Sequence, residues 1–309
     1  MSLQEVAPVQ AAEEVRLSAL RRLTQRLAVT NSIAMGVLWL ITLLVGALFI
    51  YIIVYLIVEG VSTLITPTFW GTTDAGIAPQ LFNTFYILIL TELILVPISL
   101  AGAIYLVEYS PQGRFIDVIH FAAETLSGVP SLVLGMFGFL AFAVYAHMGI
   151  SRLAGALTLL CLNFPLALRL FEQALGSVPN DLREGALALG ATKWRAIRTV
   201  VLPSATPVLI TAVILTAGKI VGESAALIFT MGLFNPSNVF TLNPLIPSNT
   251  LTTWLYYLKG PGAGSTSLSS SQETAVAAGI SAVLIILLLI INLSARAIGR
   301  LIQRRLTAA

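Results

Sequence analysis

The stretch Ala275-Val-Ala-Ala-Gly-Ile-Ser-Ala-Val-Leu-Ile-Ile-Leu-Leu-Leu-Ile-Ile-Asn-Leu-Ser-Ala295 carries no charged residue from end to end. Backbone N–H and C=O groups in hydrocarbon must bond to one another, so an apolar run of about 20 residues is typical of a helix that crosses a bilayer. Five further runs of this kind lie at approximately 31–58, 81–107, 124–146, 149–171 and 205–231. The sequence therefore predicts an all-α membrane protein, a bundle of six transmembrane helices.

The composition excludes several classes of protein. Hydrophobic residues make up 57% of the 309 positions and charged residues only 10%, whereas about a quarter of the residues in soluble domains are charged. The single cysteine, Cys161, allows no intrachain disulfide, and the two histidines have no suitably spaced carboxylates for a hydrolytic metal site. Gly218-Lys219 is followed by Ile220 and lacks the glycine that a Walker loop needs upstream. We expect no cofactor bound by this chain, no enzymatic activity of its own and no nucleic-acid binding.

Lys and Arg resist translocation and so predict the orientation of the helices. They cluster before the first run, after the second, between the fourth and fifth, and after the last, while the opposite side holds only Arg152 and Lys259. This pattern predicts a multi-pass protein with both termini in the cytoplasm. The predicted domains are a cytoplasmic segment 1–30, a six-span domain 31–301 and a cytoplasmic tail 302–309. The outer loop 232–272 contains a predicted short helix near 250–258 and a Gly/Ser-rich linker after it.

The loop 179–203 is a polar insertion between two apolar runs, and it predicts a helix, a turn and a second helix. Asp181 and Glu184 have the spacing of a capping box, which would start the first helix at Asp181. Gly190 stands where a left-handed residue would close that helix, and Thr192 is placed to cap the next one. Pro203 is expected to end the second helix.

The residues of this loop form a pattern with fixed spacing. Three residues separate the group Glu184-Gly185-Ala186 from Gly190, and nine residues separate Gly190 from Val200. Leu202 and Pro203 complete the pattern. The pattern resembles the EAA loop of ABC importer permeases, with Gly185 and Val200 as its two departures. The resemblance implies that the loop docks into a groove on a cytosolic ATPase, with Glu184 and Gly190 as the leading coupling residues. The alternative is an ordinary amphipathic helix pair between two spans.

Three other segments, 103–109, 126–131 and Gly218-Lys-Ile-Val-Gly-Glu-Ser-Ala-Ala-Leu-Ile-Phe-Thr230, resemble the PstA-type phosphate permeases. In the last segment Lys219 stands for an arginine and Ser224 for a threonine. The resemblance implies phosphate import across a bacterial inner membrane, with this chain forming half of the pore. It also implies a PstC-like permease, a PstB-like ATPase dimer that binds ATP and Mg, and a PstS-like phosphate-binding protein.

Lys219 is the leading residue of the predicted translocation pathway. A cation inside a span costs about 2.5 kcal/mol or more, so it requires a partner or water. Glu223 is four residues further along the predicted helix, and Glu92 lies at a similar predicted depth in the second run. We expect Lys219 to pair with one of them, with Ser224 beside the pathway; a static Lys219–Glu223 pair at a helix interface is the alternative.

The fourth run contributes three further candidates for the pathway. Arg169 and Glu172 have the spacing of a pair on one helix, although an arginine at the membrane interface would also explain Arg169. Asn163 precedes Pro165 and is predicted to place a polar group at a kink that faces the pore.

Other transport functions are alternatives for the same sequence. An ABC importer permease for molybdate or sulfate would share the loop 179–203 but not the segment 218–230. A secondary transporter would need a coupling-ion site and commonly has inverted repeats, and the sequence shows neither.

Overall fold

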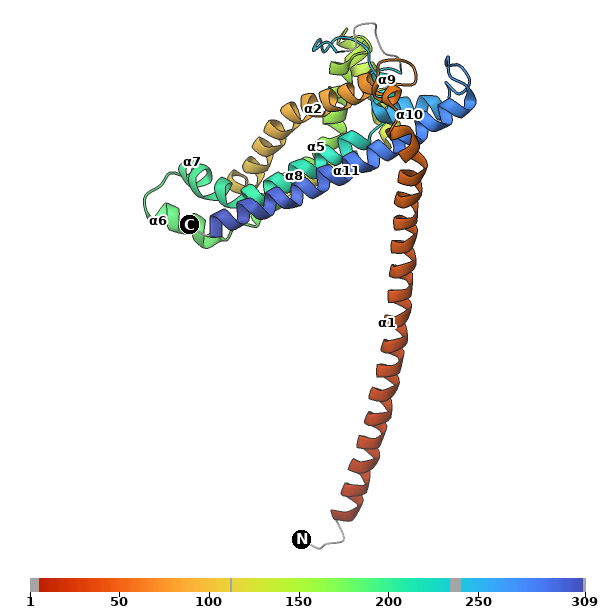
Figure 1. Cartoon of the computed structure of the whole chain (residues 1–309). Coiled ribbons are helices and arrows are strands. Elements are labelled where there is room, and N and C mark those ends of the chain that lie inside the picture. Colours follow the sequence, from red (N-terminus) through yellow and green to blue (C-terminus); the bar gives the residue numbers. More distant parts are fainter. Residues whose placement is uncertain (1–5, 112, 234–239, 308–309) are drawn as a thin grey trace. The chain divides into compact units, whose positions relative to one another are not determined.

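The computed structural model describes residues 6–111, 113–233 and 240–307. These residues form two compact units, 6–55 and 56–307. The first unit is a single helical segment, the N-terminal part of helix α1 (Val6–Leu64), and its described side chains from Leu27 onward are almost all exposed. Helix α1 ends inside the second unit, which holds every other element of the fold (Figure 1).

The second unit is built entirely of helices among the residues described. They are listed in chain order as η1 (Pro67–Trp70), α2 (Ala78–Ile104), α3 (Arg114–Ser127), α4 (Ser131–Gly138), α5 (Arg152–Gly176), α6 (Asn180–Ala188), α7 (Lys193–Ala196), α8 (Leu202–Gly222), α9 (Ala225–Thr230), α10 (Leu251–Lys259) and α11 (Ser270–Thr307). Three π-helical turns extend this set: η2 (Tyr105–Tyr109) after α2, η3 (Phe139–Tyr145) after α4 and η4 (Ile197–Val201) before α8.

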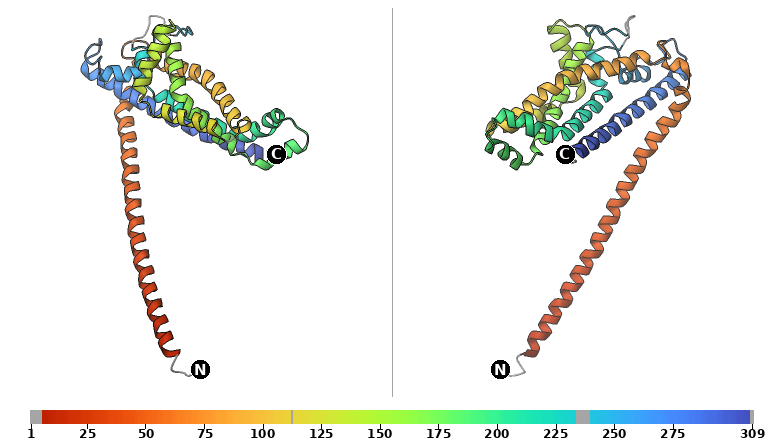
Figure 2. Two further views of the ribbon diagram at one scale, coloured as in Figure 1. Left: turned by 180° about the vertical axis from the view of Figure 1, so that it is seen from behind. Right: turned by 60° about the vertical axis from the view of Figure 1, so that its left-hand side comes forward.

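Within the described ranges, five helical segments are long and apolar enough to cross a membrane, and the bent pair α3 and α4 makes a sixth if it counts as one span. The prediction of an all-α membrane bundle is therefore confirmed. Helix α5 lies at the centre of the second unit, with α2, α8, α3, α4 and α9 packed around it, and α11 lies along α8 (Figures 1 and 2). Helices α6 and α7 lie at one end of the bundle, and α9 and α10 lie at the other, which we call the α10 end.

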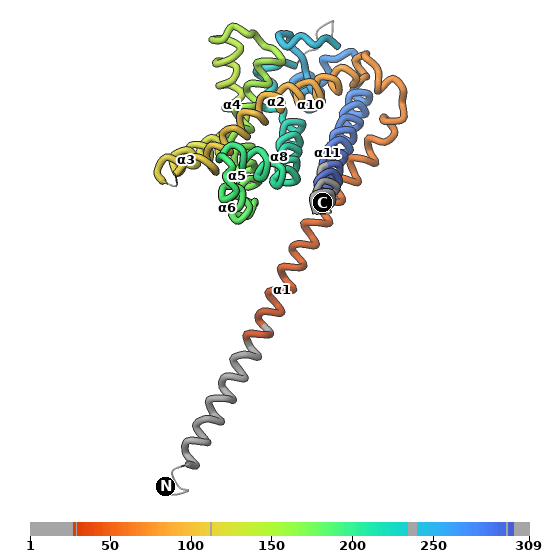
Figure 3. Tube along the Cα trace, turned by 90° about the vertical axis from the view of Figure 1, so that its left-hand side faces the viewer, coloured from red at the N-terminus to blue at the C-terminus, as the bar shows by residue number. Residues whose placement is uncertain are grey.

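Two of the six predicted runs are broken in the structure. The third run, 124–146, is not one helix, because α3 and α4 meet at a 99° bend. Gly128 and Pro130 lie at this bend, and proline lacks the N–H that would continue the helix while it also restricts the residue before it. Figure 3 shows α3 leaving the bundle in a different direction from α4.

The fifth run, 205–231, is broken near its far end and extended at its start. Helix α8 stops at Gly222, Glu223 adopts an extended conformation with φ −78° and ψ 132°, and α9 begins at Ala225. At the other end Pro203 does not terminate the preceding helix, because one helical run continues from Lys193 to Gly222. Pro203 has no N–H to bond within this run, and it lies directly after the π turn η4, where the regular α-helical hydrogen-bond pattern is already altered.

Small residues allow the closest helix crossings of the second unit. A Cβ added to Gly138 would lie 2.0 Å from the hydroxyl oxygen of Thr158 on α5, and one added to Gly135 would lie 2.8 Å from Cα of Ala226 on α9. Small side chains at such positions bring backbones together in membrane bundles, where lipid offers no hydrophobic drive for helix association. Gly135 and Gly138 therefore let α4 pack against both α5 and α9.

The crossing at Gly138 predicts a stability effect. Gly138→Ala should destabilise the protein by about 1–3 kcal/mol, because the new methyl group overlaps Thr158 and a packed crossing cannot expand freely. The measurement is the thermal unfolding midpoint of the detergent-solubilised protein, with Gly176→Ala as the control because a Cβ there meets nothing within 4 Å. Adding Thr158→Ala to Gly138→Ala should restore part of the loss. Equal midpoints for Gly138→Ala and Gly176→Ala would contradict the close crossing.

Candidate functional site

The loop 179–203 forms a compact knuckle of two helices, α6 and α7, and we keep the name knuckle for residues 179–201. Gly190 has a φ of +83° and follows the C-cap of α6, which confirms its predicted left-handed role. The Thr192 hydroxyl accepts from the N–H of Arg195 at 3.4 Å and caps α7, also as predicted. The capping box is wrong, because α6 begins at Asn180 after Pro179 and has no side-chain cap. Asp181 lies instead in the first turn of α6.

The surface of the knuckle is open and lined by small residues. No residue of α6 is buried, and Glu184 and Gly185 are exposed while Ala186 is half-buried. A groove of about 610 Å³ lies between the two helices, and its lining includes the small residues Gly185, Ala186, Gly190 and Ala191. Of the remaining motif residues, Leu202 packs against the core and Pro203 lies in the first turn of α8. The motif residues therefore form part of the exposed groove and part of the first turn of α8.

Sequence reasoning missed the contacts that hold the knuckle to the bundle. The Arg183 guanidinium of α6 donates from Nε to the Glu108 carboxylate of η2 at 2.9 Å. The Lys193 ammonium of α7 lies 5.1 Å from the centre of the Tyr109 ring, the next residue of the same π turn. Glu108 and Tyr109 belong to the segment 103–109 singled out above, but no sequence pattern indicated their partners.

Among the described residues, helix α8 has an exposed stripe along one side, and Gly299 of α11 lies close to Thr211 at its edge. Its exposed residues Ser204, Val208, Thr211, Leu215 and Lys219 recur three or four positions apart, so they share one side of the helix. We call this the open face of α8. Lys219 lies in the last turn of α8 rather than in mid-span, because the helix ends at Gly222.

Neither predicted partner forms an ion pair with Lys219, and within the described ranges no other carboxylate does. Glu223 is not on the same helix face because α8 has already ended, and its carboxylate instead accepts from the N–H of Ala226 at 3.2 Å, in the first turn of α9. Glu92 on α2 accepts from the hydroxyl of Thr216 at 2.7 Å, and Thr216 is three residues before Lys219. Glu92 therefore contacts α8, but the carboxylates of Glu92 and Glu223 accept hydrogen bonds from Thr216 and Ala226 and not from Lys219.

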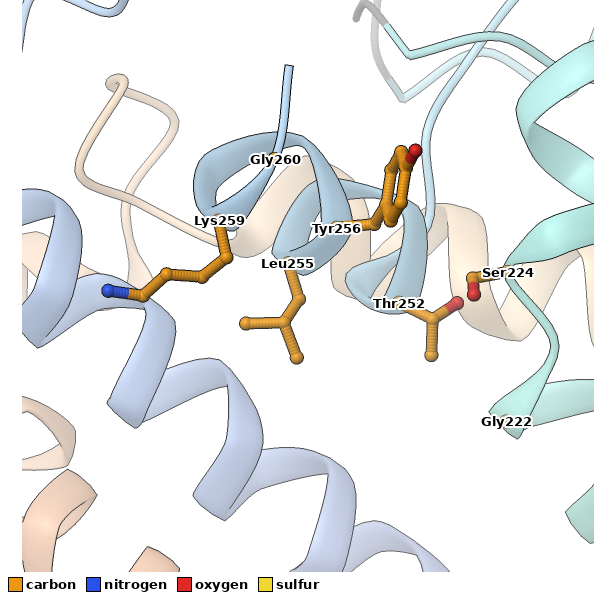
Figure 4. Close-up of a pocket in the computed structure, with 7 residues that line it drawn as sticks. All are labelled: Gly222, Ser224, Thr252, Leu255, Tyr256, Lys259 and Gly260. Carbon is orange, nitrogen blue, oxygen red and sulfur yellow. The ribbon is translucent and has the colours of Figure 1, made fainter. Parts of the chain in front are cut away.

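A pocket of about 410 Å³ adjoins the break between α8 and α9. Its lining includes Gly222, Ser224, Thr252 and Lys259 (Figure 4). The Thr252 hydroxyl donates to the Glu223 carbonyl at 2.8 Å, which satisfies a backbone oxygen that the break leaves without a helical partner. In Figure 4 Ser224 and Thr252 lie toward one end and Lys259 extends toward α11, where its ammonium donates to Thr274 at 3.1 Å.

The predicted pair within the fourth run is wrong. Arg169 forms an ion pair with Glu124 of α3, and Glu172 bonds to His120 of α3 at 3.0 Å. Both residues therefore join α5 to α3 rather than to each other. Asn163 is fully buried and donates to the Leu159 carbonyl at 2.8 Å, so its side chain lies inside the bundle and not on the open face of α8.

Arg152 is a further residue that the sequence left without a role. It is fully buried at the start of α5, where it donates to Asn83 of α2 at 2.6 Å, to Ser248 at 2.9 Å and to the Thr241 carbonyl. Its guanidinium also lies 4.7 Å from the centre of the Tyr86 ring. A buried charge with this many neutral partners fixes the segment 241–248 to α2 and α5, and each hydrogen bond to such a charged group contributes about 1.5–3 kcal/mol.

Comparison with known proteins places this architecture in a family. Residues 94–308 match the family model described as the binding-protein-dependent transport system inner membrane component. The chain is 38% identical over 295 residues to the probable ABC transporter permease protein YqgI of Bacillus subtilis strain 168, which covers 91% of this chain and 98% of that protein. It is 34% identical over 208 residues to the phosphate transport system permease protein PstA 2 of Mycobacterium tuberculosis strain CDC 1551 / Oshkosh, with 67% and 64% covered.

A solved structure of the MetNI methionine ABC transporter in an inward-facing conformation shares the fold, with a TM-score of 0.59, 20% identity, and 73% of this chain and 95% of that chain covered. The family match spans more than half of this chain, and the relative YqgI matches it almost end to end. The chain therefore belongs to the inner-membrane components of binding-protein-dependent transport systems, the permease subunits of ABC importers.

Proposed function

We propose that this permease imports inorganic phosphate, that the open face of α8 lines the pathway, and that the knuckle docks on the ATPase. The observation that carries the proposal is Lys219, an exposed cation without an ion-pair partner in the described part of the chain, one turn before the break in α8. The permease of an ABC importer works with a separate ATPase and a substrate-binding protein, so this chain supplies the route and not the hydrolysis.

The position of Lys219 indicates that its side chain faces water rather than lipid. Lys219 lies within the last turn of the apolar helical run Lys193–Gly222, and charged side chains inside such runs almost always face a bundle interior or a water-filled cavity. Broken helices in transporters likewise mark substrate sites, because irregular backbone is tolerated where it lines a cavity. Both features meet within one turn at Lys219 and Glu223.

The cargo is argued from charge and from relatives. A lysine that faces the pathway attracts an anion as a compact point charge, without the bidentate geometry of arginine. Several relatives are named as phosphate transport system permeases, including PstA 2 of Mycobacterium tuberculosis at 34% identity and the PstA homolog of Mycoplasma pneumoniae at 37%. The relative YqgI carries no substrate in its name, and the methionine transporter supports the fold alone.

The assembly that follows is a PstC-like companion permease, two PstB-like ATPase subunits and an external PstS-like binding protein. The knuckle and both termini face the cytoplasm in this arrangement, and the α10 end faces outward. ATP binding closes the ATPase pair, moves the knuckle and opens the pathway to receive phosphate from the binding protein. Hydrolysis then returns the pathway to the inward-facing state.

Lys219→Gln should lower ATP-dependent phosphate uptake by about tenfold or more, because it removes the one cation on the open face of α8 among the described residues while leaving a polar side chain there. The assay is uptake of labelled phosphate by the complete importer in liposomes, with sulfate and molybdate as competitors. Lys259→Gln is the matched control, since its ammonium bonds to Thr274 and should not be required. Lys219→Arg should retain uptake.

Full phosphate uptake by Lys219→Gln would show that Lys219 is not needed in the pathway. Uptake of sulfate or molybdate in place of phosphate by the native importer would overturn the cargo and leave the importer class intact.

Glu184→Lys should separate ATP hydrolysis from transport, because it reverses a charge on the exposed surface of α6 that the proposal places against the ATPase. Membrane insertion should be unaffected, since Glu184 contributes nothing to the buried core. The measurement is phosphate uptake and ATP hydrolysis in the same liposomes, with the amount of permease in the membrane determined in parallel. Native uptake by Glu184→Lys would contradict docking through this helix.

A further inference from the structure

The strongest set of polar contacts outside the motif residues lies where the knuckle meets the end of α2. Arg183 uses all three nitrogens of its guanidinium. Nε donates to Glu108, Nη2 donates to the Leu175 carbonyl at 2.7 Å, and Nη1 donates to the Val178 carbonyl at 2.6 Å and to Asn180 Oδ1 at 3.0 Å. One side chain therefore connects α6, the end of α5 and the π turn that ends α2.

These contacts add hydrogen bonds to backbone carbonyls where α5 ends. Leu175 lies in the last turn of α5 and its carbonyl also accepts from the N–H of Val178 at 3.3 Å, while Val178 lies two residues beyond the helix. Only 8% of the Glu108 side chain and 16% of the Arg183 side chain are exposed. A largely buried ion pair repays its desolvation only when its remaining hydrogen-bonding groups are satisfied, and the guanidinium meets this condition here. The pair is thus fixed in one geometry rather than formed and broken at the surface.

A second contact holds the other half of the knuckle to the same turn. Lys193 of α7 lies over the ring of Tyr109, the neighbour of Glu108. A cation within about 6 Å of a ring centre is attracted by the electron density of its face. Two successive residues of η2 therefore hold both helices of the knuckle, and we call these four residues the η2 clamp: Glu108, Tyr109, Arg183 and Lys193.

We infer that the η2 clamp makes α2 move together with the knuckle, with Arg183 as the positioning residue that transmits the motion. The inference rests on the proposed docking of the knuckle on the ATPase. Without the clamp, a displaced knuckle would pull only on α5 and α8, to which the chain joins it. With the clamp, the same displacement also reaches α2, which is far from the knuckle in the sequence.

The route through α2 leads back to the proposed pathway. Helix α2 carries Glu92, which bonds to Thr216 on α8, one turn before Lys219. Helix α2 also packs against α5 along its length. The knuckle is therefore connected to the neighbourhood of Lys219 twice, through α8 itself and through α2. Movement of α2 relative to α8 would change the environment of Lys219, which is the residue proposed to meet the anion.

The test compares Glu108→Gln and Arg183→Gln with Glu124→Gln in the complete importer reconstituted in liposomes. Glu124→Gln is the matched control because it breaks an Arg–Glu pair of the same kind that is mostly exposed, and exposed pairs contribute little. The measured quantity is phosphate taken up per ATP hydrolysed. The two clamp variants should lower this ratio by about five- to tenfold, the lower part of the range typical of coupling between sites, while ATP hydrolysis continues. The control should keep the native ratio.

A second readout follows the motion itself and does not depend on the cargo. In a Cys161→Ala background, spin labels at the exposed positions Ala188 on α6 and Ile98 on α2 report the distance between the knuckle and α2. In the otherwise native importer this distance should be the same with bound ATP analogue and without nucleotide. In Glu108→Gln it should differ between the two states.

The outcomes separate the clamp from the proposed function. A nucleotide-dependent distance in the native importer, or a native coupling ratio in both clamp variants, would overturn the inference. If the native importer takes up no phosphate but keeps a constant distance that Glu108→Gln abolishes, the clamp is supported and the phosphate assignment fails. If both clamp variants lose hydrolysis and uptake together while Glu124→Gln keeps them, Arg183 and Glu108 serve assembly alone and the inference is wrong.

Discussion

The need to satisfy every backbone polar group without water controls this structure more than any single contact. Long helices satisfy the backbone polar groups over most of the described chain. Where a helix stops inside an apolar run, these groups need other hydrogen-bond partners. At the break after Gly222 the Glu223 carboxylate receives the N–H of Ala226, and the Glu223 carbonyl receives the hydroxyl of Thr252. This break is therefore paired with the polar side chains of Glu223 and Thr252, which hold α9 and α10 around the end of α8.

The same requirement explains why the functional candidates lie at the two ends of α8. Its first turn emerges from the knuckle through a π turn, and such turns commonly occur at functional positions in helices. Its last turn carries Lys219 next to the break. One helix thus joins the groove of small residues to the exposed cation. Helix α5 supports it from the buried side, where side chains such as Leu159 and Phe171 are almost fully enclosed.

The sequence was informative where the signal was local. The apolar runs predicted the membrane helices, and the spacing from Glu184 to Pro203 located the knuckle, because both patterns are read within one segment. Gly190 and Thr192 were correctly assigned since a left-handed residue and a cap depend on their neighbours alone. The bend at Pro130 was missed because proline is common inside membrane helices and breaks only some of them.

Long-range partners could not be read from the sequence. Arg169 and Glu172 suit each other by spacing, yet α3 brings Glu124 and His120 closer to them. Lys219 and Glu223 failed as a pair for a different reason, because the helix that would have aligned them ends between the two residues. Arg183 stands next to the motif residue Glu184, but its partner Glu108 is 75 positions away. Only the packing of α2 against the knuckle makes that pair visible.

The central claim is that the open face of α8 meets water and not lipid in the assembled importer. The most direct measurement is the reaction rate of a small, water-soluble, membrane-impermeant thiol reagent with single cysteines at Thr211 and Leu215, in a Cys161→Ala background, with a cysteine at Leu93 of α2 as the comparison. All three positions are exposed in this chain. The account predicts that the two α8 positions react and that their rates change when an ATP analogue is bound, while Leu93 stays inert. Inert cysteines at Thr211 and Leu215 in both states would contradict it.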